Sequence, residues 1–155
     1  MRFAHVGHDV WVGEWTACDA HSNEFPLQIH LWKPYNWKEK RFCKRCHAST
    51  ETHNGSGMAI EWVEGQRLAQ MSVTVEEVAE YAKQPGKLFI HCAGGVCRST
   101  TLCIVSKVAR GANVFDAIRD IYSNLWDQYG NPPDWCTKTI EDVLHWAHGL
   151  PPKKD

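Results

Sequence analysis

The segment from Lys87 to Arg110 constrains the fold of this chain more than any other part of its sequence. The first part of this segment, up to His91, is apolar without alternation. This pattern predicts a strand buried on both faces, as in a parallel sheet. Residues 99–110 carry apolar side chains on nearly every side, which predicts a buried helix. A short turn with two glycines joins the two. Together they predict an α/β fold with a ligand site at the carboxyl edge of the sheet.

The other predicted elements are short and are separated by turn residues. Strands come first and alternate with helices, and helices then dominate. This order predicts one α/β domain over residues 1–155, with a mainly parallel central sheet flanked by helices. The remaining predicted elements are strands at 9–13, 27–32 and 58–63 and helices at 74–83, 113–125 and 140–147.

Residues 33–57 interrupt this pattern. The stretch is polar and rich in turn residues, such as Pro34 and Gly55, and we expect it to be a long surface excursion. The chain also has eight tryptophans, of which four lie in strand-like segments and are expected in the core. These four are Trp11, Trp15, Trp32 and Trp62.

Composition excludes some classes of function. Charged residues make up 23% of the chain and nearly balance, for a formal net charge of −1, so there is no global basic field to hold nucleic acid or an anionic membrane. The sequence has no apolar run long enough to span a bilayer and no signal-peptide pattern, and we therefore expect a cytoplasmic protein. The seven cysteines are not spaced as a secreted disulfide framework, so most should be free thiols.

The turn between the buried strand and the buried helix has the composition of an anion site. Small residues, Ala93, Gly94 and Gly95, allow the backbone to curl so that its N–H groups approach an oxyanion. The helix N-terminus adds its positive dipole end. Cys92 stands at the start of the curl, where this field favours the thiolate. Arg98 stands at its end and offers a planar fork for two phosphoryl oxygens.

Residues 91–99, His-Cys, five residues, Arg and Ser, resemble the signature of the protein tyrosine phosphatase superfamily. The flanking strand and helices resemble its compact dual-specificity branch. The resemblance implies hydrolysis of phosphotyrosine, and also of phosphoserine or phosphothreonine, through a cysteinyl-phosphate intermediate. The implied partner is a phosphorylated protein or peptide, and no cofactor is expected. The balanced charge and the lack of a long apolar run argue against a membrane or nucleic-acid partner. The loop interior has no lysine, which argues against a highly charged lipid head group.

The resemblance also assigns roles to matching residues. Cys92 would be the nucleophile, and Ser99 would hydrogen-bond its sulfur and help it leave in the second step. His91 would hold the loop and tune the thiol, unless it is only a packed histidine. The phosphate would be bound by the Arg98 side chain and by backbone N–H groups. Those N–H groups belong to Ala93, Gly94, Gly95, Val96, Cys97 and Arg98.

The general acid is the point at which the chain departs from the family. The family normally uses an aspartate about thirty residues before the cysteine, but this sequence has none between Asn54 and Cys92. Glu61 and Glu64 are the carboxylates near the right place, and we favour Glu64 because it lies where the strand gives way to a loop. If neither acts, the acid either comes from elsewhere or is missing, and a chain without an acid would be a pseudophosphatase that binds phosphate without turnover.

Three further hypotheses concern cysteines and basic residues. Cys97 could form a protective disulfide with Cys92, as in the similar loop of low-molecular-weight phosphatases, or could simply pack. A zinc site could join two pairs of residues. We expect instead that no metal is bound and that these cysteines are free thiols. The basic, aromatic stretch from 32 to 45 keeps an RNA 5′-phosphatase as an alternative. The zinc hypothesis rests on Cys18, His21, Cys43 and Cys46.

Overall fold

A computed structural model describes residues 1–32, 57–92 and 96–153 of the chain. Several predictions fall on the remaining residues and therefore lie outside the described part. They concern the surface excursion except Gly57, the CxxC of Cys43 and Cys46, and the centre of the phosphate loop at 93–95.

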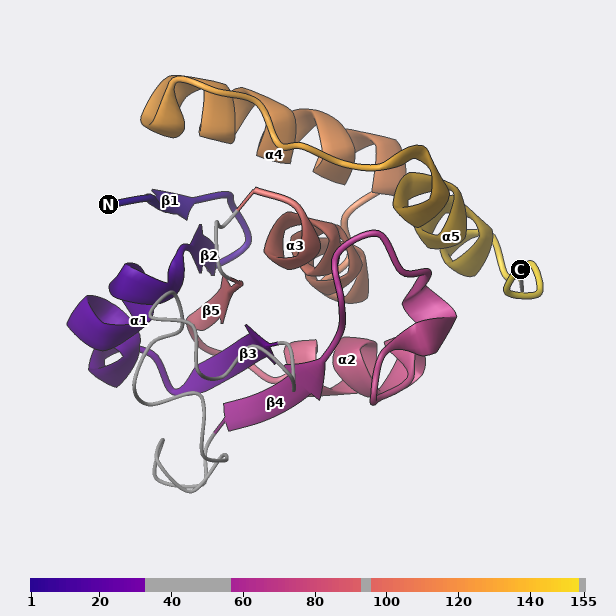
Figure 1. Ribbon diagram of the computed structural model, residues 1–155, viewed down its shortest axis with the longest axis horizontal. Coiled ribbons are helices and arrows are strands. Elements are labelled where there is room, and N and C mark those ends of the chain that lie inside the picture. Colours follow the sequence, from indigo (N-terminus) through magenta and orange to yellow (C-terminus); the bar gives the residue numbers. More distant parts are fainter. Residues whose placement is uncertain (33–56, 93–95, 154–155) are drawn as a thin grey trace.

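The predicted α/β architecture is confirmed. A five-stranded sheet has the order β1-β2-β5-β3-β4, in which only β1 runs antiparallel to its neighbour (Figure 1). The predicted strands at 27–32 and 9–13 correspond closely to β3 and β2, whereas β1 was not predicted. The strands are β1 (Phe3–His5), β2 (Val10–Gly13), β3 (Leu27–Trp32), β4 (Gly57–Glu61) and β5 (Leu88–His91).

Two of the helices begin where the sequence places a capping side chain. The Thr74 hydroxyl accepts a hydrogen bond from the Glu77 N–H, and the Asn113 side chain accepts bonds from the N–H groups of Phe115 and Asp116. One prediction was wrong: Trp15 lies in no strand but opens helix α1, where it is half-buried. The helices are α1 (Trp15–His21), α2 (Val75–Ala82), α3 (Arg98–Ala109), α4 (Val114–Tyr129) and α5 (Thr137–Ala147), with short 3₁₀ turns at Ser22–Glu24 and Leu68–Gln70.

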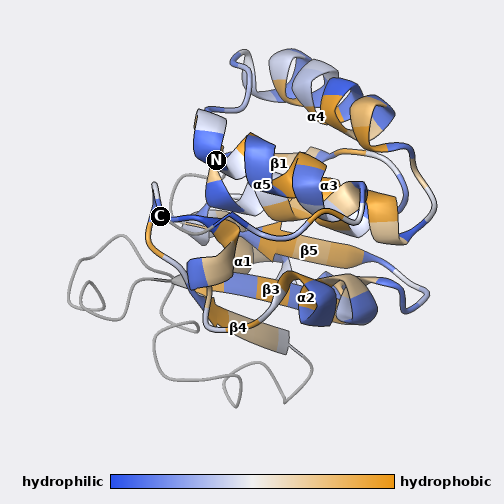
Figure 2. Ribbon diagram, turned by 90° about the vertical axis from the view of Figure 1, so that its right-hand side faces the viewer, coloured by the Kyte–Doolittle hydropathy of each residue, from blue (hydrophilic) through white to orange (hydrophobic). Residues whose placement is uncertain are grey.

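Strand β5 is central in the sheet and all four of its residues are buried. Figure 2 shows that the strand is mostly hydrophobic. Because side chains alternate along a strand, its two faces meet different partners. Leu88 and Ile90 belong to the main core, which the helices α2–α5 complete, whereas Phe89 belongs to a smaller cluster under α1. Figure 1 shows α1 on one side of the sheet and the other helices on the opposite side. The alternation places His91 on the α1 side and Cys92 on the α3 side.

Candidate active site

Cys92 leaves the end of β5 and faces the first turn of α3. Its sulfur lies 3.1 Å from the hydroxyl oxygen of Ser99, a hydrogen-bonding distance for a thiol or thiolate. Cys92 is 3% exposed, and Ser99 is fully buried. Residue 98 begins α3, so the sulfur lies beside a hydroxyl in the first turn of a helix, where the N-terminal dipole is positive. The structure therefore brings together the predicted nucleophile and its predicted hydrogen-bond partner.

The end of the loop is held from two directions. Within α3, the hydroxyls of Thr100 and Thr101 lie 2.8 and 2.9 Å from the Cys97 carbonyl oxygen. From the chain before α5, the Asp134 N–H donates to the Val96 carbonyl at 2.8 Å. From the sequence, the Asn-Pro-Pro in the segment before α5 predicts only an interruption between two helices. It gives no sign that this segment contacts the loop. The segment nevertheless restrains the backbone on which a bound phosphate would depend.

Arg98 is the first residue of α3 and is only 4% exposed. Its Nη1 donates a hydrogen bond to the Trp62 carbonyl oxygen at 2.7 Å. Trp62 directly follows β4, so this bond ties the phosphate loop to the chain that leaves that strand. A guanidinium has five N–H donors in a rigid fork. The single bond to Trp62 therefore orients the group and leaves other donors for a ligand.

The turn after Trp62 presents Glu64 to solvent. Gly65 adopts a positive φ of 88°, which a glycine tolerates without strain. Gln66 closes the turn: its side-chain oxygen accepts from the Val63 N–H at 3.1 Å, and its carbonyl accepts from the Trp62 indole at 3.2 Å. Glu64 is therefore carried by a turn with a defined shape that begins at the residue to which Arg98 binds.

Cys97 provides evidence for where Glu64 lies. Burial raises the pKa of the Cys97 thiol to about 12, and the negative charge of Glu64 is the second cause, ahead of Cys92 and Cys136. Glu64 is thus close enough to the end of the loop to act on it electrostatically. Glu61, in contrast, ends the edge strand β4, and its backbone pairs with Ser72. This arrangement favours Glu64 over Glu61 for a role at the loop.

The raised pKa of Cys97 also bears on the proposed disulfide. A thiol with a pKa near 12 is almost entirely protonated at neutral pH, and only the thiolate attacks a sulfenic acid. Cys97 is buried, and in the described part of the chain neither it nor Cys18, Cys92, Cys103 or Cys136 is in a disulfide. A disulfide between Cys92 and Cys97 stays a prediction, and we expect its formation to be slow.

His91 contacts a histidine rather than packing against apolar groups alone. Its Nε2 lies 2.7 Å from Nδ1 of His30, on the α1 side of the sheet. Cys18 of α1 lies beside the same ring, with its sulfur 3.6 Å from His30 Nδ1. His21, the partner that its spacing suggested for Cys18, instead lies 2.5 Å from Glu24. In the described part of the chain, Cys18 is therefore grouped with His30 and His91.

Comparisons with known proteins give a likeness of fold only. No protein-family model and no curated protein matches the sequence. Among solved structures, PTPMT1 superposes with a TM-score of 0.67 at 12% identity, covering 95% of this chain and 94% of the other. Tk-PTP in its active form gives 0.60 at 16% identity, with 95% and 96% covered. The human tyrosine phosphatase-like serine/threonine/tyrosine-interacting protein gives 0.64 at 9% identity, with 95% and 96% covered.

These likenesses span nearly the whole chain, so they concern the arrangement of the entire domain and not the loop alone. The chain has the fold of the cysteine-based phosphatases of the tyrosine and dual-specificity type, which confirms the fold that the sequence motif implied. Within residues 1–32, 57–92 and 96–153, no helix combines the length and hydrophobicity needed to cross a bilayer.

Proposed function

We propose that this chain is a cysteine-dependent phosphomonoester hydrolase that acts on phosphotyrosine, and also on phosphoserine or phosphothreonine, in a protein or peptide. One observation carries the proposal: the sulfur of Cys92 lies 3.1 Å from the Ser99 hydroxyl at the junction of β5 and α3. Arg98, buried in the same first helical turn, adds a permanent positive charge. A nucleophile, a cation and a helix N-terminus at one point suit attack on a phosphoryl group.

In the first step, the Cys92 thiolate would attack phosphorus and form an S–P bond as the P–O bond to the leaving group breaks. Arg98 and the loop N–H groups would bind the equatorial oxygens. Glu64, as the carboxylic acid, would give its proton to the leaving oxygen. In the second step, Glu64 would take a proton from water, whose oxygen attacks phosphorus. The S–P bond then breaks, and the Ser99 hydroxyl would stabilise the departing thiolate.

Three other assignments have support of their own. One neighbour, PTPMT1, was solved in complex with PI(5)P, so a phosphoinositide is the second candidate substrate. Another neighbour is named as a phosphatase-like interacting protein, which fits a pseudophosphatase. The basic, aromatic stretch in residues 32–45 supports an RNA 5′-phosphatase. The loop interior, Ala-Gly-Gly-Val-Cys, adds no basic residue for a second phosphate, which favours a singly phosphorylated side chain.

The proposal is tested by turnover of a small aryl phosphate, followed by a panel of natural substrates. The leaving group of an activated aryl phosphate, such as a nitrophenyl ester, needs little help from an acid, so the loop alone should hydrolyse it. We expect turnover, and a kcat/KM that is higher for a phosphotyrosyl peptide than for short-chain PI(5)P or a 5′-triphosphorylated RNA. A preference for either of the latter would replace the proposed substrate. Binding of vanadate without turnover would favour the pseudophosphatase.

Glu64→Gln tests the general acid. The variant should slow hydrolysis of esters with poor leaving groups by about 10²–10⁴-fold but change that of an activated aryl ester far less. The reason is that only a poor leaving group needs a proton as its bond to phosphorus breaks. The measurement is kcat/KM for a series of aryl phosphates of rising leaving-group pKa, which should fall more steeply in the variant.

Glu61→Gln is the matched control and should leave this dependence unchanged, because Glu61 ends an edge strand. A steeper dependence in Glu61→Gln would transfer the role to that residue. If neither variant changes the series, the acid lies elsewhere and the assignment of Glu64 is wrong.

A further inference from the structure

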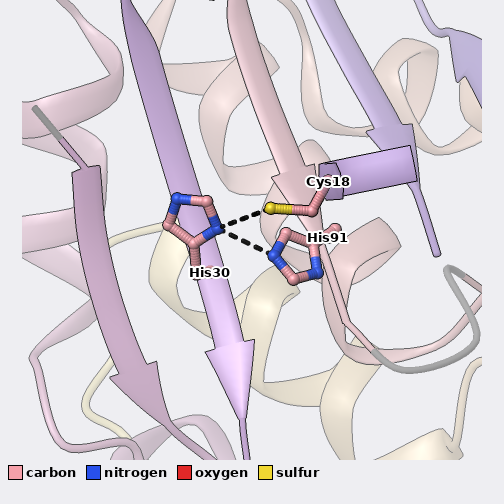
Figure 3. Close-up of side chains that lie close together, drawn as sticks. All are labelled: Cys18, His30 and His91. Atoms are coloured by element: carbon pink, nitrogen blue, oxygen red, sulfur yellow. Dashed lines mark hydrogen bonds between the residues drawn. The ribbon is translucent and has the colours of Figure 1, made fainter. Parts of the chain in front are cut away.

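A cluster of three buried side chains lies on the face of the sheet opposite to Cys92. Cys18 comes from α1, His30 from β3 and His91 from the end of β5, and Figure 3 shows all three side chains converging. One ligand atom from each lies within 4.8 Å of the other two. Cys18 is 0% exposed and both histidines are 1% exposed. The phosphatase mechanism proposed above uses neither Cys18 nor His30.

The orientation of the His30 ring is fixed by hydrogen bonds. The Gln28 side-chain nitrogen donates to the carbonyl oxygens of Ser22 and Phe25, at 2.5 and 3.0 Å. The Gln28 side-chain oxygen therefore faces His30 and can only accept, so His30 Nε2, at 3.0 Å, carries a proton. In the neutral ring, Nδ1 is then a lone pair directed at the cluster. Metal-binding histidines typically donate one ring N–H to a neighbouring carbonyl or carboxylate oxygen while the other ring nitrogen faces the metal.

The same reasoning gives the proton position on His91. His30 Nδ1 has no proton in the neutral ring, so the 2.7 Å contact requires His91 Nε2 to donate. The second nitrogen of a neutral His91 ring, Nδ1, is then an acceptor. Without a bound ion, the chain of bonds from Gln28 through His30 thus selects one of the two tautomers of His91.

We propose that Cys18 Sγ, His30 Nδ1 and His91 Nε2 form a site for a thiophilic ion of the zinc class. One thiolate and two imidazoles are a donor set that Zn²⁺ accepts, with a fourth position left open. Zinc bond lengths at a tetrahedral angle place sulfur and nitrogen about 3.6 Å apart and two nitrogens about 3.3 Å apart. The Cys18 to His30 distance is already 3.6 Å, and the two histidine nitrogens, at 2.7 Å, must separate slightly.

Binding of the ion would change the state of His91. Cys18 would give up its thiol proton to solvent and bind as the thiolate, and His91 Nε2 would coordinate through its lone pair. The proton of a neutral His91 must then be on Nδ1, so that this nitrogen changes from acceptor to donor. His91 directly precedes Cys92 in the chain. This consequence rests on the proposed function: we infer that an ion in the site lowers phosphatase activity, because it changes the hydrogen bonding of His91 next to the nucleophile.

The binding claim is tested without reference to activity. The starting protein is the full chain with Cys43, Cys46 and Cys92 changed to serine, which removes three other candidate thiolate ligands and leaves Cys97, Cys103 and Cys136 in place. Co²⁺ serves as a coloured substitute for zinc. One equivalent should produce a thiolate-to-cobalt charge-transfer band in the near ultraviolet, and Zn²⁺ should abolish it by displacement. Adding Cys18→Ser should remove the band, and His30→Asn should weaken Co²⁺ binding at least about 10-fold.

Cys136→Ser is the matched control: it removes one thiol outside the cluster and should leave the band intact. Circular dichroism verifies that each variant folds, and His30→Asn serves if Cys18→Ser does not fold. No band in the starting protein, or a band that survives Cys18→Ser, would overturn the site.

The regulatory claim is measured on protein with Cys43 and Cys46 changed and Cys92 intact, as the ratio of activity with and without Zn²⁺. We expect Cys18→Ser to abolish the inhibition. Equal inhibition with and without Cys18 would mean that zinc acts elsewhere, which overturns the coupling. Absence of any turnover would refute the proposed function, while the cobalt spectrum would still report on the site.

Discussion

Cys92→Ser is expected to reduce hydrolysis of an aryl phosphate by at least about 10⁴-fold, because it removes the only atom assigned to attack phosphorus. A serine hydroxyl is almost fully protonated at neutral pH, and no base is assigned to activate it. The loop backbone and Arg98 should be unaffected, so binding of phosphate or vanadate should persist. The measurements are kcat for the aryl ester and Kd for vanadate by calorimetry.

Cys136→Ser provides the control for thiol removal at this site. Cys136 is half-buried and close enough to the loop to affect the pKa of Cys97, but the mechanism gives it no role. We expect its activity to stay close to that of the wild type. Activity that survives Cys92→Ser would refute the covalent mechanism, and loss of vanadate binding in that variant would show that the substitution disturbs the loop.

Arg98→Lys is expected to lower kcat/KM for the aryl phosphate by about 10³-fold. The positive charge remains, but an ammonium cannot donate to two phosphoryl oxygens in one plane. The variant also loses the 2.7 Å bond from the guanidinium to the Trp62 carbonyl, which holds the turn that carries Glu64. We therefore expect a rise in KM together with a fall in kcat, both measurable in steady-state kinetics.

The control for Arg98→Lys is Arg119→Lys on the exposed face of α4, where the arginine pairs with Asp116 at the surface. This variant should be as active and as stable as the wild type, because an exposed ion pair contributes little. If Arg98→Lys retained full activity with an unchanged thermal unfolding curve, Arg98 would not bind the phosphoryl group.

Those parts of the fold that depend on local signals could be predicted from the sequence. The strand pattern of residues 27–32, which forms β3, and the caps at Thr74 and Asn113 depend only on neighbouring residues, and all three match the structure. The juxtaposition of Cys92 and Ser99 was implied by the resemblance of residues 91–99 to the phosphatase signature, and the structure shows it.

Features that depend on distant partners could not be predicted in the same way. The spacing of Cys18 and His21 suggested a shared site, but Cys18 meets His30, which reaches it only because β3 lies beside β5. Trp15 was misassigned because a seven-residue helix gives too short a periodic pattern to distinguish it from a strand.

The interior position of Lys107 is another feature of this kind. A lysine near the end of a helix would be expected at the surface, yet Lys107 is 1% exposed and donates to the Val6 carbonyl, with Asp120 3.6 Å away. Burial lowers its pKa, and the nearby Asp120 partly offsets this. Only the packing of α3 against the first residues of the chain and α4 reveals this environment.

The cysteinyl-phosphate intermediate is the most direct test of the account. Ser99→Ala should slow departure of the sulfur in the second step, so that the intermediate accumulates during turnover of an aryl phosphate. The reaction is stopped by rapid denaturation, and the digested protein is analysed by mass spectrometry. We predict one phosphoryl group on the peptide that contains Cys92 and none when Cys92→Ser is added. Turnover of the ester with no phosphorylated peptide, or with the phosphoryl group on another residue, would contradict the account.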